Sequence, residues 1–345
     1  MKKGLIAGLK VLVPLALGIG LVVYFYDKLS EKQRADLFTA FRSADPIWLV
    51  LSVFFGWCSH LSRAWRWRYL IGHLGYRSSF WNAYHAVMSG YFMNMVLPRA
   101  GEASRAVMLY RAEGVPFEKG FGTILAERAV DMIILLSIAA ITLALQLERL
   151  ELFKERIDNF RFQDQIDRFN GNVEESNSWG IIITSIVILL VLIGLWFIIT
   201  RPAIRLKLRS AARGFLDGLR SVIRTEQKGL FILHTVLIWG LYVTMFWVGF
   251  FALPSTAAVP FSGVMAGFIA GSVGIVLVQG GIGAYPAFVA LIVSVYMGAP
   301  EGGGIIHPDA LAMGWLLWAA QTLMIIVLGG ISLLLISRKK TPAIA

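Results

Sequence analysis

The stretch NMVLPRAGEASR, from Asn94 to Arg105, interrupts an apolar region with a proline and then places charged residues close together. Pro98 has no backbone N–H, so it does not continue a helix interior without cost. Arg99, Glu102 and Arg105 follow within a few residues. Charged side chains inside a membrane are expensive and mark functional sites. The stretch therefore predicts either a broken helix beside a polar cavity or a cytoplasmic loop with solvated charges.

The composition of the chain indicates a membrane protein. Of its 345 residues, 57% are hydrophobic and only 15% are charged, whereas soluble domains carry about a quarter charged residues. The net charge of +11 does not indicate a nucleic-acid partner, because the basic residues cluster beside apolar segments. The single cysteine, Cys58, excludes an internal disulfide and a CxxC metal or redox site.

Six apolar stretches are long enough to be transmembrane helices, which need about 20 residues. Two further apolar regions are interrupted in the middle, and these predict broken or re-entrant elements. No small-residue cleavage site precedes Asp27, so the first stretch is expected to remain as an uncleaved span. The predicted spans are 4–26, 46–62, 122–147, 179–200, 230–253 and 309–336, and the broken elements are 80–110 and 262–298.

The distribution of lysine and arginine predicts which side of the membrane each loop faces. Basic residues gather in 63–77, 201–229 and 338–340, so we expect these segments and both termini to be cytoplasmic. The amphipathic loop 148–178 then lies outside, with its apolar face on the outer interface. The basic stretch 208–222 is either a helix that recognises anionic headgroups or a plain positive-inside loop.

With this orientation, the two halves of the chain have the same order of elements and opposite topology. Each half contains two spans, a broken element and a third span. We therefore predict an all-α polytopic membrane protein with about six transmembrane helices and two broken or re-entrant elements in an inverted repeat. The first repeat is 1–147, the extracytoplasmic loop is 148–178, and the second repeat is 179–345. Such repeats, with interrupted helices near the midplane, are typical of transporters.

The second break, VQGGIGAYP, contains no charged residue. Its glycines, Gly280, Gly281 and Gly283, permit a tight turn and a close approach of two segments. Gln279 and Tyr285 flank them, and this turn is expected to shape the gate opposite the charged break. Either break alone is also explained by a simple kink, but matching positions in two inverted halves favour a functional role.

The charged break carries the predicted binding chemistry. If residues 101–110 form a returning half-helix, its N-terminus near Arg99 presents free N–H groups and partial positive charge, which suit a phosphate. Glu102 and Arg105 are three residues apart and can pair on one face of that half-helix. The motif would then hold a headgroup between its charged residues.

A second polar group, AERAVD, opens the third span with Glu127, Arg128 and Asp131. Arg128 can pair with Asp131, which lies three residues further on. We also expect an electrostatic lock between this group of charges and either Arg99 or Arg105, which charge reversal at Arg105 and Asp131 together would test. Anchoring of the span at the cytoplasmic surface is the alternative interpretation.

Signatures of other chemistry are few. The five histidines lack metal-ligand spacing, and the chain contains no GxSxG nucleophile motif and no Walker A motif. No cofactor, metal site or ATP-driven step is therefore predicted. Aromatic residues near the second span are interpreted as an interfacial belt, with ligand stacking as the alternative. These residues are Trp57, Trp65, Trp67 and Tyr69.

Three motifs in this order resemble a known family. They are N-x-x-L-P-x-x-G-E-x-x-R at Asn94–Arg105, E-R-x-x-D at Glu127–Asp131 and GG-I-G at Gly280–Gly283. Over roughly 10–335, the chain is similar to the transmembrane region of lysylphosphatidylglycerol synthases and to stand-alone flippase-like membrane proteins. The resemblance implies a module that moves lipids between leaflets. Because the sequence ends at Ala345 without an aminoacyl-transferase domain, synthase activity is not expected.

The sequence thus predicts a flippase for an anionic or aminoacylated phospholipid, or another lipid-linked headgroup, in a bacterial cytoplasmic membrane. Two alternatives remain: a membrane enzyme that acts on a headgroup with Glu127 or Asp131 as general base, and a non-transporting envelope scaffold. The expected partner is a membrane lipid, and a homo-oligomer is allowed. The predicted substrate-binding residues are Asn94, Pro98, Arg99, Gly101, Glu102, Arg105, Glu127, Arg128, Asp131, Gln279, Gly280, Gly281, Gly283 and Tyr285.

Overall fold

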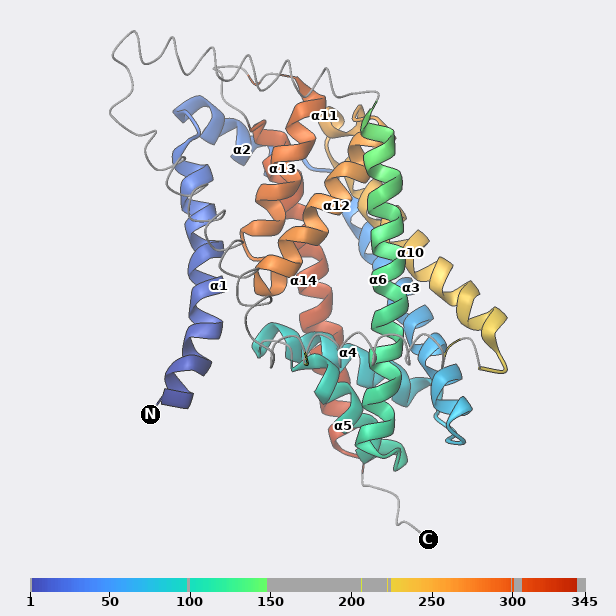
Figure 1. Cartoon of the computed structure of the whole chain (residues 1–345). Coiled ribbons are helices and arrows are strands. Elements are labelled where there is room, and N and C mark those ends of the chain that lie inside the picture. Colours follow the sequence, from blue (N-terminus) through green and yellow to red (C-terminus); the bar gives the residue numbers. More distant parts are fainter. Residues whose placement is uncertain are drawn as a thin grey trace.

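The structure, a computed structural model, is helical in every regular element of the residues that it describes (Figure 1). The prediction of an all-α membrane protein is confirmed for this part of the chain. The predicted span 179–200, the loop 148–178 and most of the basic segment 201–229 lie outside it. The described residues are 2–97, 100–147, 206, 222, 225–298, 300 and 306–339.

Capping residues determine where the second and third helices begin. Ser30 and Gln33 exchange side chain–backbone hydrogen bonds in a capping box. Asp45 caps the next helix by accepting from the backbone N–H of Ile47, and Pro46 occupies its first turn. This third helix has 28 residues and extends well beyond the predicted span 46–62. The bounds are α1 Lys2–Asp27, α2 Glu31–Ser43 and α3 Pro46–His73.

The first predicted break, 80–110, is a pair of helices. The backbone N–H of Gly101 donates to Asn94 Oδ1 at 2.7 Å and thereby ties the start of the second helix to the end of the first. A Cβ at Gly101 would meet the backbone oxygen of Gly90 and the side chain of Asn94, so the two helices need glycine at this contact. Pro98 and Arg99 lie outside the described residues. The helices are α4 Phe80–Val96 and α5 Gly101–Glu113.

The second predicted break, 262–298, is also a pair of helices. Gly280, Gly281 and Gly283 turn the chain between them with φ of +67°, +69° and +71°, a region that favours glycine. The indole N–H of Trp318 donates to the carbonyl oxygen of Gly280 at 2.6 Å and holds the turn. The elements are α12 Phe261–Leu277, the 3-10 turn η2 Gln279–Gly281 and α13 Ala284–Met297.

Four helices of the described chain are long and apolar enough to cross a membrane: α3, α6, the segment Lys228–Ala252 and α14. Shorter apolar helices include the two helices of the second pair and the second half of α1. The chain is therefore a multi-pass membrane protein. The remaining bounds are α6 Phe117–Leu147, α10 Lys228–Gly249, η1 Phe250–Ala252, α11 Pro254–Ala257 and α14 Pro308–Ser337.

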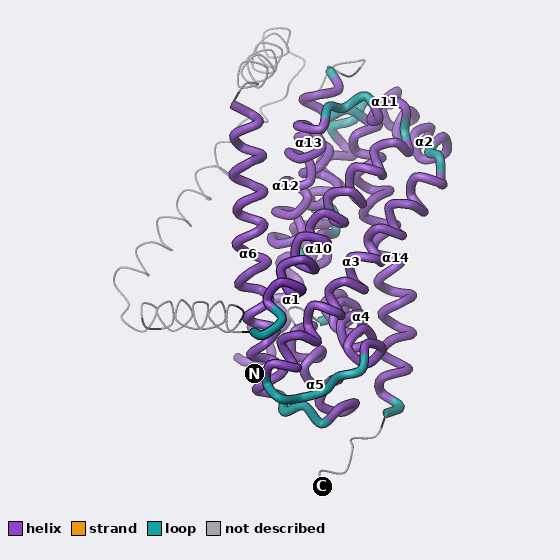
Figure 2. Tube along the Cα trace, turned by 90° about the vertical axis from the view of Figure 1, so that its right-hand side faces the viewer, coloured by secondary structure: helices purple, strands orange, loops and turns teal. Residues whose placement is uncertain are grey.

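The helices form an elongated bundle whose two ends differ (Figures 1 and 2). The start of α1 and the end of α14 lie at the lower end in Figure 1, together with the α4–α5 pair. The short helices α2 and α11 lie at the upper end. The start of α1 and the end of α14 thus share one end of the bundle.

Helix α14 packs against both helix pairs. A Cβ at Gly314 would meet the backbone of Pro286 in α13, and one at Gly329 would meet the backbone oxygen of Met88 in α4. His85 Nδ1 of α4 also lies 3.0 Å from the hydroxyl of Ser332. The long helix therefore links the charged and the uncharged pair mechanically, since packed interiors transmit strain.

Candidate functional site

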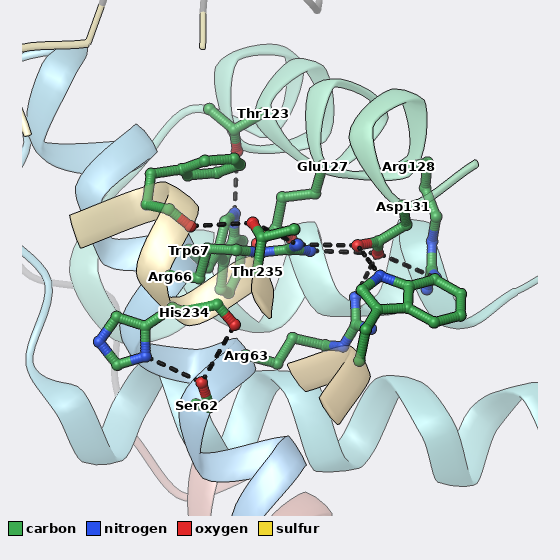
Figure 3. A network of polar contacts seen from close by, with 12 residues as sticks. Ser62, Arg63, Arg66, Trp67, Thr123, Glu127, Arg128, Asp131, His234 and Thr235 are labelled. Atoms are coloured by element: carbon green, nitrogen blue, oxygen red, sulfur yellow. Dashed lines mark hydrogen bonds and ion pairs between the residues drawn. The ribbon is translucent and has the colours of Figure 1, made fainter. Parts of the chain in front are cut away.

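The candidate site begins with two arginines of α3 that point at α6 (Figure 3). Arg63 and Arg66 are three residues apart and share one face of the helix. Their side chains are 3% and 0% exposed, respectively. The prediction that the second span ends at residue 62 and is followed by a loop is wrong here, because α3 continues to His73 and buries these two residues.

The carboxylate of Asp131 in α6 accepts hydrogen bonds from both arginines. Arg66 donates from Nη1 to Asp131 Oδ1 at 2.7 Å and from Nη2 to Oδ2 at 3.1 Å. Arg63 Nη1 donates to the same Oδ2 at 2.7 Å. From α10, Thr235 accepts from Arg66 at 3.2 Å and Trp239 donates to Asp131 at 3.4 Å. This arrangement has the bidentate geometry that makes arginine–carboxylate pairs strong, and it joins α3, α6 and α10.

Glu127 lies one turn before Asp131 and connects α3 to α5. Its Oε1 accepts from Arg66 Nε at 3.3 Å. Its Oε2 lies 2.8 Å from Nη2 of Arg105, but the two atoms are not aligned for a hydrogen bond. The Arg105 guanidinium also stacks 3.8 Å above the centroid of the Trp67 ring, a favourable cation–π contact. Arg105 is thus held by charge and stacking while Nε and Nη2 lack hydrogen-bond partners.

Glu102 and Arg128 form a more exposed pair beside this buried core. Arg128 Nη2 lies 3.3 Å from Glu102 Oε1, and the two side chains are 40% and 27% exposed. Arg128 Nη1 is also 4.0 Å from Asp131 Oδ2, which agrees with the predicted contact between those residues. Because solvent screens these two partly exposed charges, we expect the pair to contribute little to the stability of the fold.

A small pocket connects the exposed pair to Arg105. Its cavity is about 10 Å³, which is about the space of one water molecule. Five of the predicted site residues line it, and four neighbours complete the wall. These nine residues are Val87, Gly90, Tyr91 and Asn94 of α4, Gly101, Glu102 and Arg105 of α5, and Ile124 and Arg128 of α6.

The charges of the cluster do not balance. The described residues bury five charged side chains, and all five belong to this cluster: Arg63, Arg66, Arg105, Glu127 and Asp131. Three guanidinium groups therefore share two carboxylates, which leaves one surplus positive charge. Leaving a buried charge uncompensated costs several kcal/mol. An anion in the adjacent pocket would remove that cost.

One predicted pairing is wrong, and a second is made by a different carboxylate of the predicted group. Glu102 and Arg105 do not pair with each other, because the first faces Arg128 and the second faces Glu127. The predicted lock between the Glu127–Asp131 group and Arg105 is present, but Glu127 forms it at 2.8 Å. Asp131, the partner chosen for the test, pairs with Arg63 and Arg66 instead. The physical reason is the position of α3, whose arginines reach Asp131 first and leave Glu127 to Arg105. The alternative lock to Arg99 lies outside the described residues.

The interpretation of the aromatic residues is corrected at one position. Trp67 is fully buried, and its indole N–H donates to Thr123 Oγ1 at 2.9 Å. It serves as the platform for Arg105 rather than as an interfacial belt residue. Trp65 is 40% exposed and stacks on Phe80 with ring centroids 5.0 Å apart, a position that suits a membrane interface.

The predicted residues of the second break do not line this pocket. Gly283 abuts Gly18 of α1, where a Cβ would meet the backbone oxygen. Tyr285 is buried against Gly271 and Gly281, and Gln279 begins the η2 turn. The η2 turn contacts α4, so the second pair touches the first without contributing charge to the cluster.

The sequence reasoning missed four contributors to the cluster. They are Arg63, Arg66, Thr235 and Trp239. One signal for the two arginines was available. They are three residues apart among aromatic residues, a pattern that fits a buried helix face better than a loop. Thr235 and Trp239 carried no signal, because apolar helices commonly include both residue types.

The bundle and its buried ion cluster define a polytopic membrane protein with a buried polar site. Residues 11–330 match the family described as the lysylphosphatidylglycerol synthase TM region, and the chain belongs to this family. It is 38% identical over 74 residues to a UPF0104 membrane protein of Methanocaldococcus jannaschii. That match covers 21% of this chain and 22% of the relative. No solved structure matches.

Proposed function

We propose that this protein binds the phosphate of an anionic lipid headgroup beside Arg105 and moves the lipid between membrane leaflets. The observation that carries the proposal is the surplus positive charge of the buried cluster, next to a pocket where Arg105 has unbonded donors. Intramembrane charges mark substrate pathways. A guanidinium group matches phosphate in both charge and geometry.

The surroundings of the pocket support a lipid as the ligand. The pocket lies between α4, α5 and α6, and α6 is one of the helices long enough to span a membrane. Glu102 and Arg128 are its more exposed members. A headgroup would first meet this exposed pair and then reach Arg105, while its acyl chains stay in the surrounding bilayer.

The order of elements supports translocation over simple binding. The described residues contain a long helix, a helix pair and a long helix twice: α3, α4–α5 and α6, then α10, α12–α13 and α14. We infer that these are the two halves of an inverted repeat, an organisation associated with alternating access. In this scheme the lower end faces the cytoplasm, in accordance with the basic residues near it.

The present conformation is closed around the site. A cavity of about 10 Å³ does not admit a phosphate group, so the α4–α5 pair must move for a headgroup to bind. Its contacts with α14 through Met88 and His85 would pass that movement to α13 through Pro286. One pair would open as the other closes.

A reconstituted translocation assay tests the proposal. Purified protein in proteoliposomes is given a panel of fluorescent phospholipids, and the rate of leaflet exchange is measured for wild type and Arg105→Gln. We expect the variant to lose roughly tenfold or more of the rate for anionic lipids, the scale of one charge-assisted hydrogen bond. Arg105→Lys should retain part of the rate because it keeps the charge.

The matched control is Arg111→Gln, an exposed arginine in the last turn of the same helix, which should exchange lipids at the wild-type rate. Size-exclusion profiles check that every variant is folded. Equal rates for wild type and folded Arg105→Gln would overturn the proposal. Consumption of the headgroup by the purified protein would instead assign it to an enzyme.

A further inference from the structure

The number of charges in the cluster specifies the number of charges that its ligand should carry. We infer that the pocket selects a monoanionic phosphodiester headgroup over a dianionic phosphomonoester, and that Glu127 sets this preference. The inference rests on the proposed function, because it concerns the same pocket. It assigns Glu127 the role of a specificity-determining residue that does not itself bind the lipid.

The first step is the charge of the empty site. Arg63 and Arg66 are bound to Asp131 through aligned hydrogen bonds of 2.7 to 3.1 Å, although Arg63 Nε has no hydrogen-bond partner. Among the carboxylates of the described residues, Arg105 contacts only Glu127, and that contact is misaligned for a hydrogen bond. Glu127 meanwhile keeps its bond to Arg66 at 3.3 Å. The surplus positive charge is thus located at Arg105, the arginine that lines the pocket.

The net charge of the cluster after binding depends on the charge of the ligand. A phosphodiester carries one negative charge, so it neutralises the five-residue cluster. A phosphomonoester carries close to two negative charges at pH 7 and above, since its second pKa is about 6, and it leaves one surplus negative charge. In a buried site of low dielectric constant, that residual charge is costly. The exposed Glu102–Arg128 pair is neutral and does not change the count.

The third step identifies Glu127 as the residue that sets the count. Its side chain is 1% exposed, accepts a hydrogen bond from Arg66 and lies in ion-pair contact with Arg105. Replacing it with Gln keeps a side-chain oxygen for Arg66 but raises the surplus to two positive charges. Such a cluster is balanced by a dianion, so the preference should invert. Glu102→Gln changes charge at the more exposed position, where solvent screens the effect.

The experiment measures displacement of a fluorescent phosphatidylglycerol from purified protein in neutral detergent micelles. The competitors are phosphatidylglycerol as the diester, phosphatidic acid as the monoester, phosphatidylcholine as the zwitterion, and dimethyl phosphate as a water-soluble diester. At pH 8 we expect wild type to prefer phosphatidylglycerol over phosphatidic acid by roughly tenfold, the scale of one unit charge across roughly 10 Å at an effective dielectric constant of about 20. Glu127→Gln should prefer phosphatidic acid.

Lowering the pH tests the charge count in wild type alone. Phosphatidic acid becomes a monoanion at pH 5, so its affinity should approach that of phosphatidylglycerol. Phosphatidylglycerol is a monoanion at both pH values, so a change in its own affinity reports titration of the protein. The ionisable groups around the pocket are His60, Arg63 and Arg66 of α3, Tyr91 of α4, Glu102 and Arg105 of α5, Glu127, Arg128 and Asp131 of α6, and Tyr242 of α10.

The control for charge alone is Asp36→Asn, which removes one carboxylate from α2 at the opposite end of the bundle and should leave both preferences unchanged. Equal affinity of wild type for the diester and the monoester at pH 8 would overturn this inference and leave the proposed function intact. Anionic lipids that bind no better than phosphatidylcholine would overturn the proposed function itself. Displacement by dimethyl phosphate as strong as by the lipid would assign the pocket to a soluble ester.

Discussion

The two helix pairs of this protein occupy corresponding places in the chain and are held in different ways. The α4–α5 pair is fastened by charge, because Arg105 reaches Glu127 of α6 and Glu102 reaches Arg128. The α12–α13 pair contains no charged residue and is fastened by glycine contacts and one indole hydrogen bond. The same backbone arrangement, two short helices joined by a turn, therefore carries buried charge in one half of the chain and close glycine contacts in the other.

The two kinds of contact also differ in what they require of the neighbouring helices in a membrane. A buried charge is tolerated only when partners compensate it, so the first pair needs α3 and α6 beside it. The second pair needs close backbone approach, which glycine permits without any partner side chain. Changes in charge should therefore act on the first pair, and changes in volume should act on both.

The largest expected effect comes from breaking the centre of the ion cluster. Asp131→Asn leaves Arg63 without its buried counter-charge and leaves Arg66 with only the longer contact to Glu127 at 3.3 Å, so we expect a loss of about 3–5 kcal/mol in unfolding free energy. Unfolding in mixed detergent micelles measures it. Asp309→Asn, in the first turn of α14 at the upper end, is the matched control and should change little. A loss under about 1 kcal/mol for Asp131→Asn would show that the charges do not hold the first half together.

An intermediate loss of stability is expected where each pair depends on a glycine in close contact with another backbone segment. Gly101→Ala would place a Cβ against the backbone oxygen of Gly90, and Gly283→Ala would place one against that of Gly18. Each should cost about 1–3 kcal/mol in stability, with Gly283 also penalised by its positive φ of +71°. Thermal stability of the purified variants is the measurement.

The control for these glycines is Gly122→Ala in α6, where an added Cβ meets no atom within 4 Å. Because alanine favours a helix over glycine, this variant should be as stable as wild type or slightly more stable. If Gly101→Ala behaves like Gly122→Ala, the close approach within the first pair is not required.

The smallest expected effect concerns the turn of the second pair. Trp318→Phe removes the hydrogen bond to the Gly280 carbonyl and leaves most of the packing, so we expect a loss of about 1 kcal/mol. Lipid exchange and binding of anionic lipid are measured on the same samples. If the turn acts as a gate, Trp318→Phe should change the exchange rate and leave lipid binding at the wild-type level. Weaker lipid binding in Trp318→Phe would contradict the separation of roles between the pairs.

Much of the architecture followed from local sequence. Pro98 and the glycines near Gly280 marked both breaks, and the capping residues Ser30 and Asp45 explain where helices start. The predicted site residues Asn94, Gly101, Glu102, Arg105 and Arg128 do line one pocket. Local signals succeed here because helix ends and turns depend on neighbouring residues.

The sequence by itself determined the class of protein, the two broken elements and three of the buried charges of the site, Arg105, Glu127 and Asp131, since composition and backbone preference act over short distances. The tertiary structure alone decided which charges meet. Arg63 and Asp131 are 68 residues apart in sequence, and their pairing depends on how α3 and α6 cross. The count of basic residues placed Arg63 and Arg66 in a loop, whereas helix packing buried them in α3. Because these two arginines pair with Asp131, the surplus positive charge falls on Arg105.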